Sequence, residues 1–225
     1  MAICAVFDVD GTLVDSNYQH VLAWHRAFRR YDVVSPLWAI HRHLGMGADK
    51  LVPRVAGEDV DGASGDGIRQ AWKEEFDRLI GEVAAIPGAL ELLEAVKDSR
   101  AELVLASSGK PDHVEHFLDL VKARDVTDAW TTSEDVDNTK PEPDLLEVAL
   151  SKAAGGAAVT FGDATWDALA ARRLGLPAVL VRTGGFGADE PRDAGAVDVF
   201  ESLTEVQADL GRLLGLAAPV RKDAG

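Results

Sequence analysis

Two carboxylates stand two residues apart near the start of the chain, directly after a short apolar run. Asp8 and Asp10 follow Ile3–Phe7, and Gly11 comes next. Such a run predicts a buried strand, and parallel sheets bind ligands at the carboxyl ends of their strands. Because two nearby carboxylates repel each other, the pair indicates either a bound cation or one protonated acid. Gly11 would allow a tight turn and offer its amide to an anion.

Polar side chains also stand near the later apolar runs. A hydroxyl at a helix start suits a phosphoryl oxygen, and a lysine or a second acidic cluster could complete a site for an anion and a hard cation. Each feature has an ordinary interpretation too, because serines cap helices and lysines usually lie on solvated loops. The positions are Ser107 and Ser108 after Glu102–Ala106, Lys140 before Pro141 and Pro143, and Asp163 and Asp167 after Ala158–Phe161.

Alternating strand and helix patterns predict an α/β fold with a Rossmann-like parallel sheet and right-handed crossovers. Proline or glycine punctuates the helical segments between the apolar runs. The expected strands are Ile3–Phe7, Glu102–Ala106, Ala158–Phe161 and Ala178–Val181, and the expected helices open at Pro87, Pro111 and Pro143 and span Trp166–Leu174.

One long interval breaks this alternation, because residues 17–83 contain no strand pattern. Helical periodicity occupies Tyr18–Tyr31, Pro36–Leu44, Lys50–Val55 and Ile68–Glu82. We therefore expect an inserted α-helical cap domain of residues 16–86 over the carboxyl edge of the sheet. The α/β core would then comprise residues 1–15 and 87–225, and its tail, Leu216–Gly225, is expected to fray.

The charge balance limits the possible partners. Asp and Glu number 38 against 23 Lys and Arg, which gives a net charge of −15. Nucleic-acid binding and attachment to an anionic membrane are therefore not expected, since both depend on clustered basic residues. No apolar stretch reaches the ~20 residues of a membrane helix, and no basic leader precedes the first apolar run. We expect a cytoplasmic protein, and the sequence leaves its oligomeric state open.

Cysteine and histidine give no zinc site in the sequence. A single cysteine, Cys4, excludes an intrachain disulfide and a cysteine-rich metal site. The histidine pairs His41/His43 and His113/His116 lack a third ligand at zinc-site spacing, so we expect these side chains at the surface.

Taken together, these residues resemble the haloacid dehalogenase-like hydrolase superfamily. The resemblance is to its phosphatase branch with an α-helical (C1) cap, of the phosphoglycolate-phosphatase-like kind. The segment from Asp8 to Thr12 is similar to the first motif of that family, Ser107 to the second and Lys140 to the third. Asp163 and Asp167 match the fourth. The resemblance covers essentially the whole chain, because the expected cap falls between the first two motifs.

The resemblance implies a Mg²⁺-dependent hydrolysis of a small phosphorylated substrate through an aspartyl-phosphate. Asp8 would attack phosphorus, while Asp10 would act first as the acid and then as the base. The metal ion would bind Asp8, Asp10 through its backbone carbonyl, and Asp163, with Asp167 in a supporting position. The residues implied in phosphate binding are Gly11, Thr12, Ser107, Ser108 and Lys140.

Within the expected cap, one glycine-rich loop is the candidate for contact with the substrate. Gly45, Met46 and Gly47 would form a loop facing the active site, followed by the cations Lys50 and Arg54. The two cations would attract an anionic substrate to an acidic protein. They are equally consistent with the solvated face of a cap helix.

Other activities are compatible with parts of this pattern. A β-phosphoglucomutase-like phosphotransferase would keep Asp10 and stays open as an alternative. A dehalogenase, and usually a phosphonoacetaldehyde hydrolase, would lack this acid. A receiver-type signalling domain also uses an acidic pocket and a phosphorylated aspartate on a parallel sheet. Such a domain is much shorter and has no helical insertion after its first strand.

Overall fold

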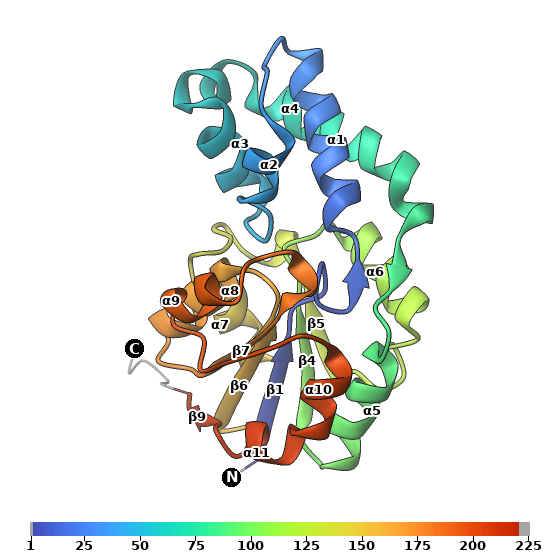
Figure 1. Ribbon diagram of the computed structural model, residues 1–225, viewed down its shortest axis with the longest axis vertical. Helices are drawn as coiled ribbons and strands as arrows, with labels where there is room; N and C mark the ends of the chain where they lie inside the picture. The colour runs from blue at the N-terminus through green and yellow to red at the C-terminus, as the bar shows by residue number, and fades with distance from the viewer. Residues whose placement is uncertain (1, 221–225) are drawn as a thin grey trace.

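The computed structural model describes residues 2–220 and contains a seven-stranded sheet (Figure 1). Six parallel strands lie in the order β5-β4-β1-β6-β7-β8, and β9 pairs antiparallel with β6. This confirms the predicted Rossmann-like α/β class. The strands are β1 Ile3–Phe7, β4 Glu102–Ala106, β5 Ala129–Thr131, β6 Ala157–Gly162, β7 Ala178–Val181, β8 Asp198–Phe200 and β9 Ala218–Pro219.

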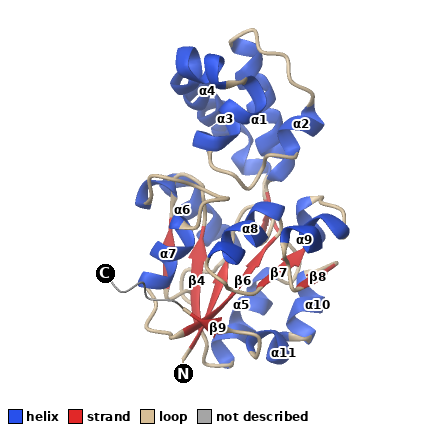
Figure 2. Ribbon diagram, turned by 90° about the vertical axis from the view of Figure 1, so that its left-hand side faces the viewer, coloured by secondary structure: helices blue, strands red, loops and turns tan. Residues whose placement is uncertain are grey.

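Side chains of β1 alternate between two apolar layers, which explains why its sequence is continuously hydrophobic. Ala5 and Phe7 belong to the layer that α5, α6, α10 and α11 cover, while Cys4 and Val6 belong to the layer under α7, α8 and α9 (Figures 1 and 2). The bounds are α5 Ala89–Asp98, α6 Pro111–Val121, α7 Asp144–Ser151, α8 Thr165–Arg173, α9 Asp189–Ala194, α10 Leu203–Ala208 and α11 Leu210–Leu214, with single 3₁₀ turns at Ser133–Asp135 and Arg182–Gly184.

A separate group of helices, residues 17–82, lies beyond the carboxyl edge of the sheet and is called the cap below. A short antiparallel pair, β2 with β3, carries the chain out of the sheet and back. Figure 2 shows that the cap consists of helices and loops, with β9 and α11 at the opposite end of the molecule. The elements are β2 Val14–Asp15, α1 Asn17–Arg30, α2 Leu37–His41, α3 Ala48–Ala56, α4 Glu58–Leu79, η1 Ile80–Glu82 and β3 Ala84–Ala85.

Helix α4 is longer than the sequence pattern predicts. The expected helix began at Ile68, whereas the observed one begins at Glu58. Glycines at positions 62, 65 and 67 weaken the helical signal of this first part. Three acidic residues in the first turn favour the helix there, because they complement the positive end of the helix dipole.

Short strands and the tail are the other departures from expectation. The predicted strands Ile3–Phe7, Glu102–Ala106 and Ala178–Val181 are found at the same residues. Strands β5 and β8 were not expected, because three residues are too few to display a pattern. The expectation of a frayed tail is wrong for Ala218–Pro219, which pair with β6, and residues 221–225 lie outside the described part.

Two cap elements are fastened to the core by charged side chains. Lys73 of α4 pairs with Asp112 of α6 at 2.8 Å, and Asp77 accepts a hydrogen bond from His113 Nε2 at 2.7 Å. His113 is therefore buried beneath the cap and is not at the surface as expected. Arg42, which directly follows α2 of the cap, pairs with Glu190 of α9 in the core.

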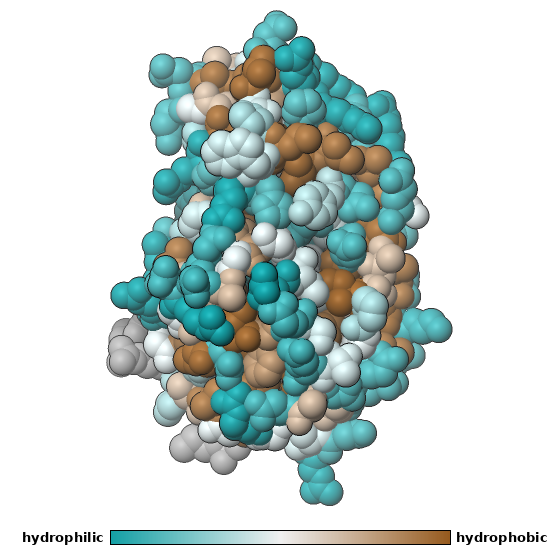
Figure 3. All heavy atoms as spheres, in the orientation of Figure 1, coloured by the Kyte–Doolittle hydropathy of each residue, from teal (hydrophilic) through white to brown (hydrophobic). Residues whose placement is uncertain are grey.

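The outer surface is mixed in polarity. On the face shown in Figure 3, hydrophilic side chains predominate, with apolar ones gathered in patches. No helix within residues 2–220 is both long enough and apolar enough to cross a membrane.

The interior of the cap is built from stacked aromatic rings and one buried carboxylate. Trp24 of α1 stacks on Trp72 of α4 with ring centroids 4.8 Å apart. Beside them, Glu75 exposes only 7% of its side chain and pairs with arginines of both helices. Its partners are Arg26 and Arg30 of α1 and Arg78 of α4.

We expect Glu75→Ala to lower the free energy of unfolding by about 1–3 kcal/mol, because buried charge-assisted hydrogen bonds are lost. Glu74→Ala is the matched control, since Glu74 pairs with the same Arg30 but exposes 47% of its side chain. An exposed ion pair of that kind contributes about 0–1 kcal/mol. Urea unfolding of both variants measures the difference, and equal losses would contradict a structural role for Glu75.

Candidate active site

The acidic residues predicted from separate parts of the sequence meet at the carboxyl edge of the sheet. Strands β1 and β6 are neighbours, and the rings of Phe7 and Phe161 stack at their ends with centroids 4.3 Å apart. The amide of Asp8 donates to the carbonyl of Phe161 at 2.8 Å, which ties the two strand ends together. Asp8 and Asp163 therefore leave adjacent strands at the same level.

Lys140 lies at the centre of this acidic group. Its residue exposes 1% of its surface, and its ammonium group pairs with Asp8 and, at 2.7 Å, with Asp167. A charged lysine is almost never buried without such partners. The two carboxylates raise the pKa of Lys140 above its usual value despite burial, so it is a fixed positive charge.

Three buried carboxylates form a group with the donors that a hard cation requires. Asp8, Asp163 and Asp167 each offer an oxygen, and the three oxygens lie within 4.8 Å of one another. All-oxygen donor sets select Mg²⁺, Ca²⁺ or Mn²⁺ over softer metals. Lys140 supplies one positive charge against three carboxylates, so the group fits a divalent cation electrostatically as well.

The pKa values of two of these carboxyls reflect the excess negative charge. Burial raises the pKa of Asp8 to about 7, and the opposing effect of Lys140 is incomplete. Burial, together with the charges of Asp167 and Asp8, raises the pKa of Asp163 well above its usual value. A bound cation would favour the ionised forms of both groups.

Asp10 has different surroundings from Asp8. Ser16 donates to Asp10 Oδ1 at 2.7 Å, His20 Nε2 lies 3.0 Å from the same oxygen, and Ser107 donates to Oδ2 at 3.3 Å. Burial raises the pKa of Asp10, but the hydrogen bonds and charge of His20 and the hydrogen bond of Ser16 outweigh it, leaving the pKa lowered. The two carboxylates of one strand end thus differ in proton affinity.

Asp163 is held in place by Thr12 and by two residues, Asn17 and Gly184, that the sequence did not single out. Asn17, the first residue of the cap, donates to Asp163 Oδ2 at 3.0 Å, and Thr12 donates to Oδ1 at 3.2 Å. Gly184 packs so closely on this carboxylate that a Cβ there would overlap Asp163 Oδ2. The sequence gives no signal for the role of Gly184, because that role depends on a contact across the fold.

The first acidic loop turns sharply at Gly11, whose φ is +75°. The amides of Gly11 and Thr12 donate to Val14 and Val9 carbonyls within the loop, and the Thr12 hydroxyl donates to Asp163. These two residues therefore shape the loop in this structure. Of the other residues implied in phosphate binding, Ser107 contacts Asp10 and Ser108 lines the neighbouring cavity.

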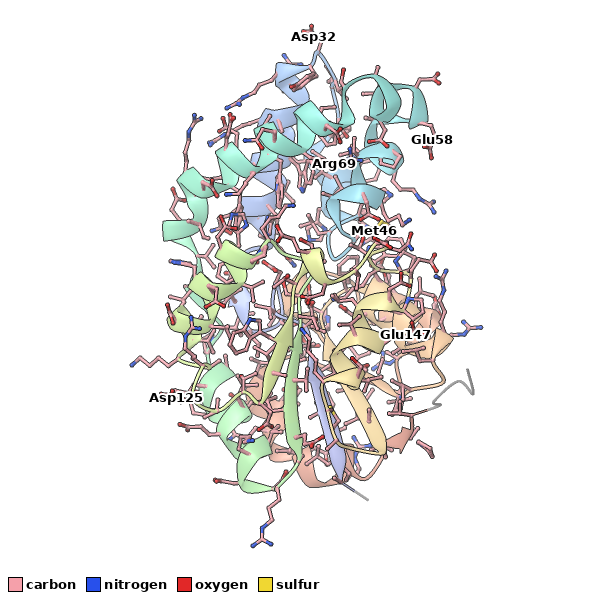
Figure 4. The ribbon with its side chains drawn as sticks, turned by 180° about the vertical axis from the view of Figure 1, so that it is seen from behind. Asp32, Met46, Glu58, Arg69, Asp125 and Glu147 are labelled. Atoms are coloured by element: carbon pink, nitrogen blue, oxygen red, sulfur yellow. The ribbon has the colours of Figure 1, made fainter. Side chains whose placement is uncertain are left out.

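A cavity of about 230 Å³ lies between cap and core, and Asp8 and Asp10 are part of its wall. The predicted loop residues Gly45, Met46 and Gly47 line it, and Figure 4 shows Met46 where the cap meets the core. Lys50 and Arg54 are not in its lining. Lys50 instead donates to Asn138 at 3.4 Å, and Arg54 is exposed, as expected for a solvated helix face.

Several cavity residues were not anticipated as site residues. Asn17, His20, Trp24, Arg69 and Trp72 of the cap all line it. Helical periodicity marks such residues only as one face of an amphipathic helix, and so gives no signal that this face borders a cavity. The further lining residues from the core include Gly109, Lys110, Ser133, Val136, Asp137 and Thr139.

A family model described as haloacid dehalogenase-like hydrolase matches residues 5–181. The chain belongs to this family. It is 30% identical over 217 residues to validoxylamine A 7'-phosphate phosphatase of Streptomyces hygroscopicus subsp. limoneus, covering 90% of this chain and 95% of the relative. Phosphoglycolate phosphatase of Caulobacter vibrioides is 28% identical over 207 residues, covering 89% and 87%.

The fold of this haloacid dehalogenase-like hydrolase is shared with solved structures. The crystal structure of a hydrolase from Pseudomonas syringae matches with a TM-score of 0.88 and 31% identity, covering 94% of this chain and 99% of that chain. The match spans both the sheet and the cap helices. A receiver-type signalling domain has no counterpart of those helices.

The raised pKa of Asp8 makes the stability of this hydrolase depend on pH. Because the folded state holds the proton more tightly than the unfolded chain, Asp8 contributes stability that is lost as pH rises towards 7. In EDTA, we expect this contribution to fall by about 2 kcal/mol between pH 5 and pH 7. Asp163 acts in the same direction.

Urea unfolding of the protein and of Asp8→Asn across this pH range isolates the contribution of Asp8. The variant should lose that part of the pH dependence, whereas Asp119→Asn, at an exposed position, should keep it. Saturating Mg²⁺ should flatten the dependence, because it favours the ionised carboxylates. Identical pH profiles for the protein and Asp8→Asn in EDTA would contradict the assignment.

Proposed function

We propose that the protein is a Mg²⁺-dependent phosphomonoester hydrolase that acts on a small phosphorylated metabolite through an aspartyl-phosphate. The observation that carries this proposal is the buried pairing of Lys140 with Asp8 and Asp167, beside a cavity. A carboxylate nucleophile, a fixed cation, an oxygen-lined metal site and a second carboxylate are what phosphoryl transfer to an aspartate requires. The names of the two relatives support the same reaction class.

Asp8 is the proposed nucleophile. One of its carboxylate oxygens attacks phosphorus, and the bond from phosphorus to the ester oxygen breaks. Lys140 stabilises the negative charge that collects on the phosphoryl oxygens, because it is already fixed beside Asp8. Ser107 and Ser108, in the loop before α6, would donate hydrogen bonds to the same oxygens.

Asp10 is the proposed acid and base. It protonates the departing alkoxide, and then takes a proton from the water that attacks the aspartyl-phosphate, which releases phosphate and restores Asp8. In the free protein the pKa of Asp10 is lowered by His20 and Ser16. The negative charge of a bound phosphate raises the proton affinity of Asp10, as the first step requires.

The metal site is proposed at the oxygen cluster. Asp8 and Asp163 would hold Mg²⁺ with the backbone carbonyl of Asp10, and Asp167 would support it while holding Lys140. When bound, the ion would neutralise charge on the phosphoryl group.

Residues 16–86 are proposed to act as the cap domain, with residues 1–15 and 87–225 as the core. The cap closes the cavity and excludes bulk water while the aspartyl-phosphate forms. Ser16, just before α1, and Asn17 and His20 of α1 contact Asp10 or Asp163 directly. Movement of the cap would therefore change the surroundings of both carboxylates.

We expect Asp8→Asn to reduce turnover of p-nitrophenyl phosphate by at least about a thousandfold, because the amide is neither an anionic nucleophile nor an equivalent metal ligand. Phosphate release measures hydrolysis specifically, and circular dichroism checks that the fold survives. Asp119→Asn removes an equal charge at an exposed site and should keep full turnover. Turnover of Asp8→Asn within tenfold of the unaltered protein would refute the nucleophile.

We expect Mg²⁺ to activate the enzyme and EDTA to abolish turnover, because the carboxylate cluster needs a divalent cation. Ca²⁺ should bind and inhibit, since its larger and more flexible coordination would misplace Asp8. Titration of activity against each ion gives the result, and Asp163→Asn should raise the Mg²⁺ concentration needed for half activation. Full activity after exhaustive chelation would contradict the metal site.

A further inference from the structure

Asp163 differs from the other two carboxylates of the proposed metal site. Asp8 and Asp167 both pair with the ammonium group of Lys140. Asp163 belongs to the same group of oxygens, but within residues 2–220 it has no ion pair. Its negative charge is therefore available to a cation, and the orientation of its carboxylate depends on other contacts.

Two neutral side chains supply those contacts, one from the core and one from the cap. Thr12, in the loop after β1, donates to Asp163 Oδ1 at 3.2 Å. Asn17, the first residue of α1, donates to Oδ2 at 3.0 Å. A carboxylate offers about four lone pairs, so these two hydrogen bonds leave others for a metal ion. Because both donors are uncharged, they orient the carboxylate without cancelling the charge that attracts the ion.

The contact between Asn17 and Asp163 is enclosed by backbone. Asn17 exposes 5% of its surface and Asp163 exposes 2%. A Cβ at Gly11 would overlap both Asn17 Nδ2 and Asp163 Oδ2, and a Cβ at Gly184 would overlap the same oxygen. Loss of the amide would therefore leave a buried carboxylate oxygen without its donor.

A second cap helix contacts the core at the same place, through the carbonyl of Gly184. His41 Nε2, at the end of α2, donates to that carbonyl at 2.9 Å, and Asn17 Nδ2 lies 3.5 Å from it. The ring of Tyr18 stacks on His41 with centroids 5.6 Å apart. Two cap helices thus meet the core at the backbone group that packs on Asp163, and Figure 1 shows the start of α1 above the carboxyl ends of the strands.

We propose that Asn17 is a positioning residue for the metal site, so that the affinity for Mg²⁺ depends on the seating of the cap. Seating here means the contact of Asn17 with Asp163 and Gly184. This inference rests on the metal site of the proposed function. When α1 is in place, Asn17 and Thr12 together hold the carboxylate of Asp163, and when α1 is displaced, Thr12 alone holds it. The coupling is reciprocal, so bound Mg²⁺ in turn favours the seated cap.

The first test measures the dissociation constant of Mg²⁺ by isothermal titration calorimetry, which needs no turnover. Asn17→Ala should raise that constant by about tenfold or more, as is usual when a hydrogen-bond partner of a metal ligand is removed. Asn17→Leu fills the same space without a donor and should raise the constant equally, which separates the lost hydrogen bond from lost packing. An unchanged dissociation constant in Asn17→Leu overturns the proposal.

Asn138→Ala is the matched control for this test. Asn138 is exposed, and its amide also links cap and core, because Oδ1 accepts from Lys50 at 3.4 Å. It contacts none of the three carboxylates of the metal site. The dissociation constant of Asn138→Ala should equal that of the unaltered protein. An increase as large as that in Asn17→Ala would overturn the specific role of Asn17.

The second test examines the reverse effect, that of the metal ion on the cap. Hydrogen–deuterium exchange of residues 20–24 of α1 is measured without Mg²⁺ and with enough Mg²⁺ to saturate each variant. Mg²⁺ should slow this exchange in the unaltered protein and should not slow it in Asn17→Ala. Thr12→Val removes the hydrogen bond from the core side, so it should weaken Mg²⁺ binding but keep the slowing at saturation. Equal slowing in the unaltered protein and Asn17→Ala, or slowing in neither, overturns the coupling.

Turnover of p-nitrophenyl phosphate separates this inference from the proposal on which it rests. Mg²⁺ binding that depends on Asn17, without turnover, overturns the phosphatase alone. Turnover in Mg²⁺ together with binding that does not depend on Asn17 overturns this inference alone. If calorimetry detects no binding of Mg²⁺ to the unaltered protein, both the metal site and the inference are overturned.

Discussion

The pairing of one buried lysine with two buried carboxylates is the constraint on which the rest of the structure depends. Lys140 cannot be buried alone, and Asp8 and Asp167 would be buried carboxylates without a paired cation if it were absent. The pairing requires that the end of β1, the loop before α7 and the start of α8 converge. The parallel sheet, with β1 beside β6, brings these three segments together, so the ion pairs depend on the fold.

The pairing leaves the site short of positive charge. Three carboxylates share one ammonium group, which is why burial raises the pKa of Asp8 and of Asp163. In the proposed function, a divalent cation offsets this deficit so that an anionic phosphate can bind favourably. The overall charge of −15 therefore does not oppose phosphate binding at this place.

The cap is part of the site as well as its cover. Its first turn supplies Asn17 to Asp163 and His20 to Asp10, while its aromatic interior supplies Trp24 and Trp72 to the cavity. The same helix α1 thus connects the carboxylates of the core with the part of the cavity that would contact a leaving group. Because these contacts span cap and core, the geometry of the acids depends on how the cap is seated.

The sequence by itself determined the α/β class and the helical interval, and it singled out Asp8, Asp10 and Asp163 after strands and Lys140 before two prolines. These follow from patterns within single segments: continuous apolar runs, proline and glycine punctuation, and polar residues directly after strands. The short strands β5 and β8, the start of α4 and the pairing of the tail came only from tertiary structure. Three-residue strands and a glycine-rich helix are stabilised by neighbours distant in sequence, which no local pattern records. For the same reason the sequence contains no signal for the site contacts of Asn17, His20, Gly184 and Trp72. It also could not show that Lys50 and Arg54 lie outside the cavity. Which residues line a cavity between two elements depends on how those elements pack, and a single segment of sequence does not contain that information.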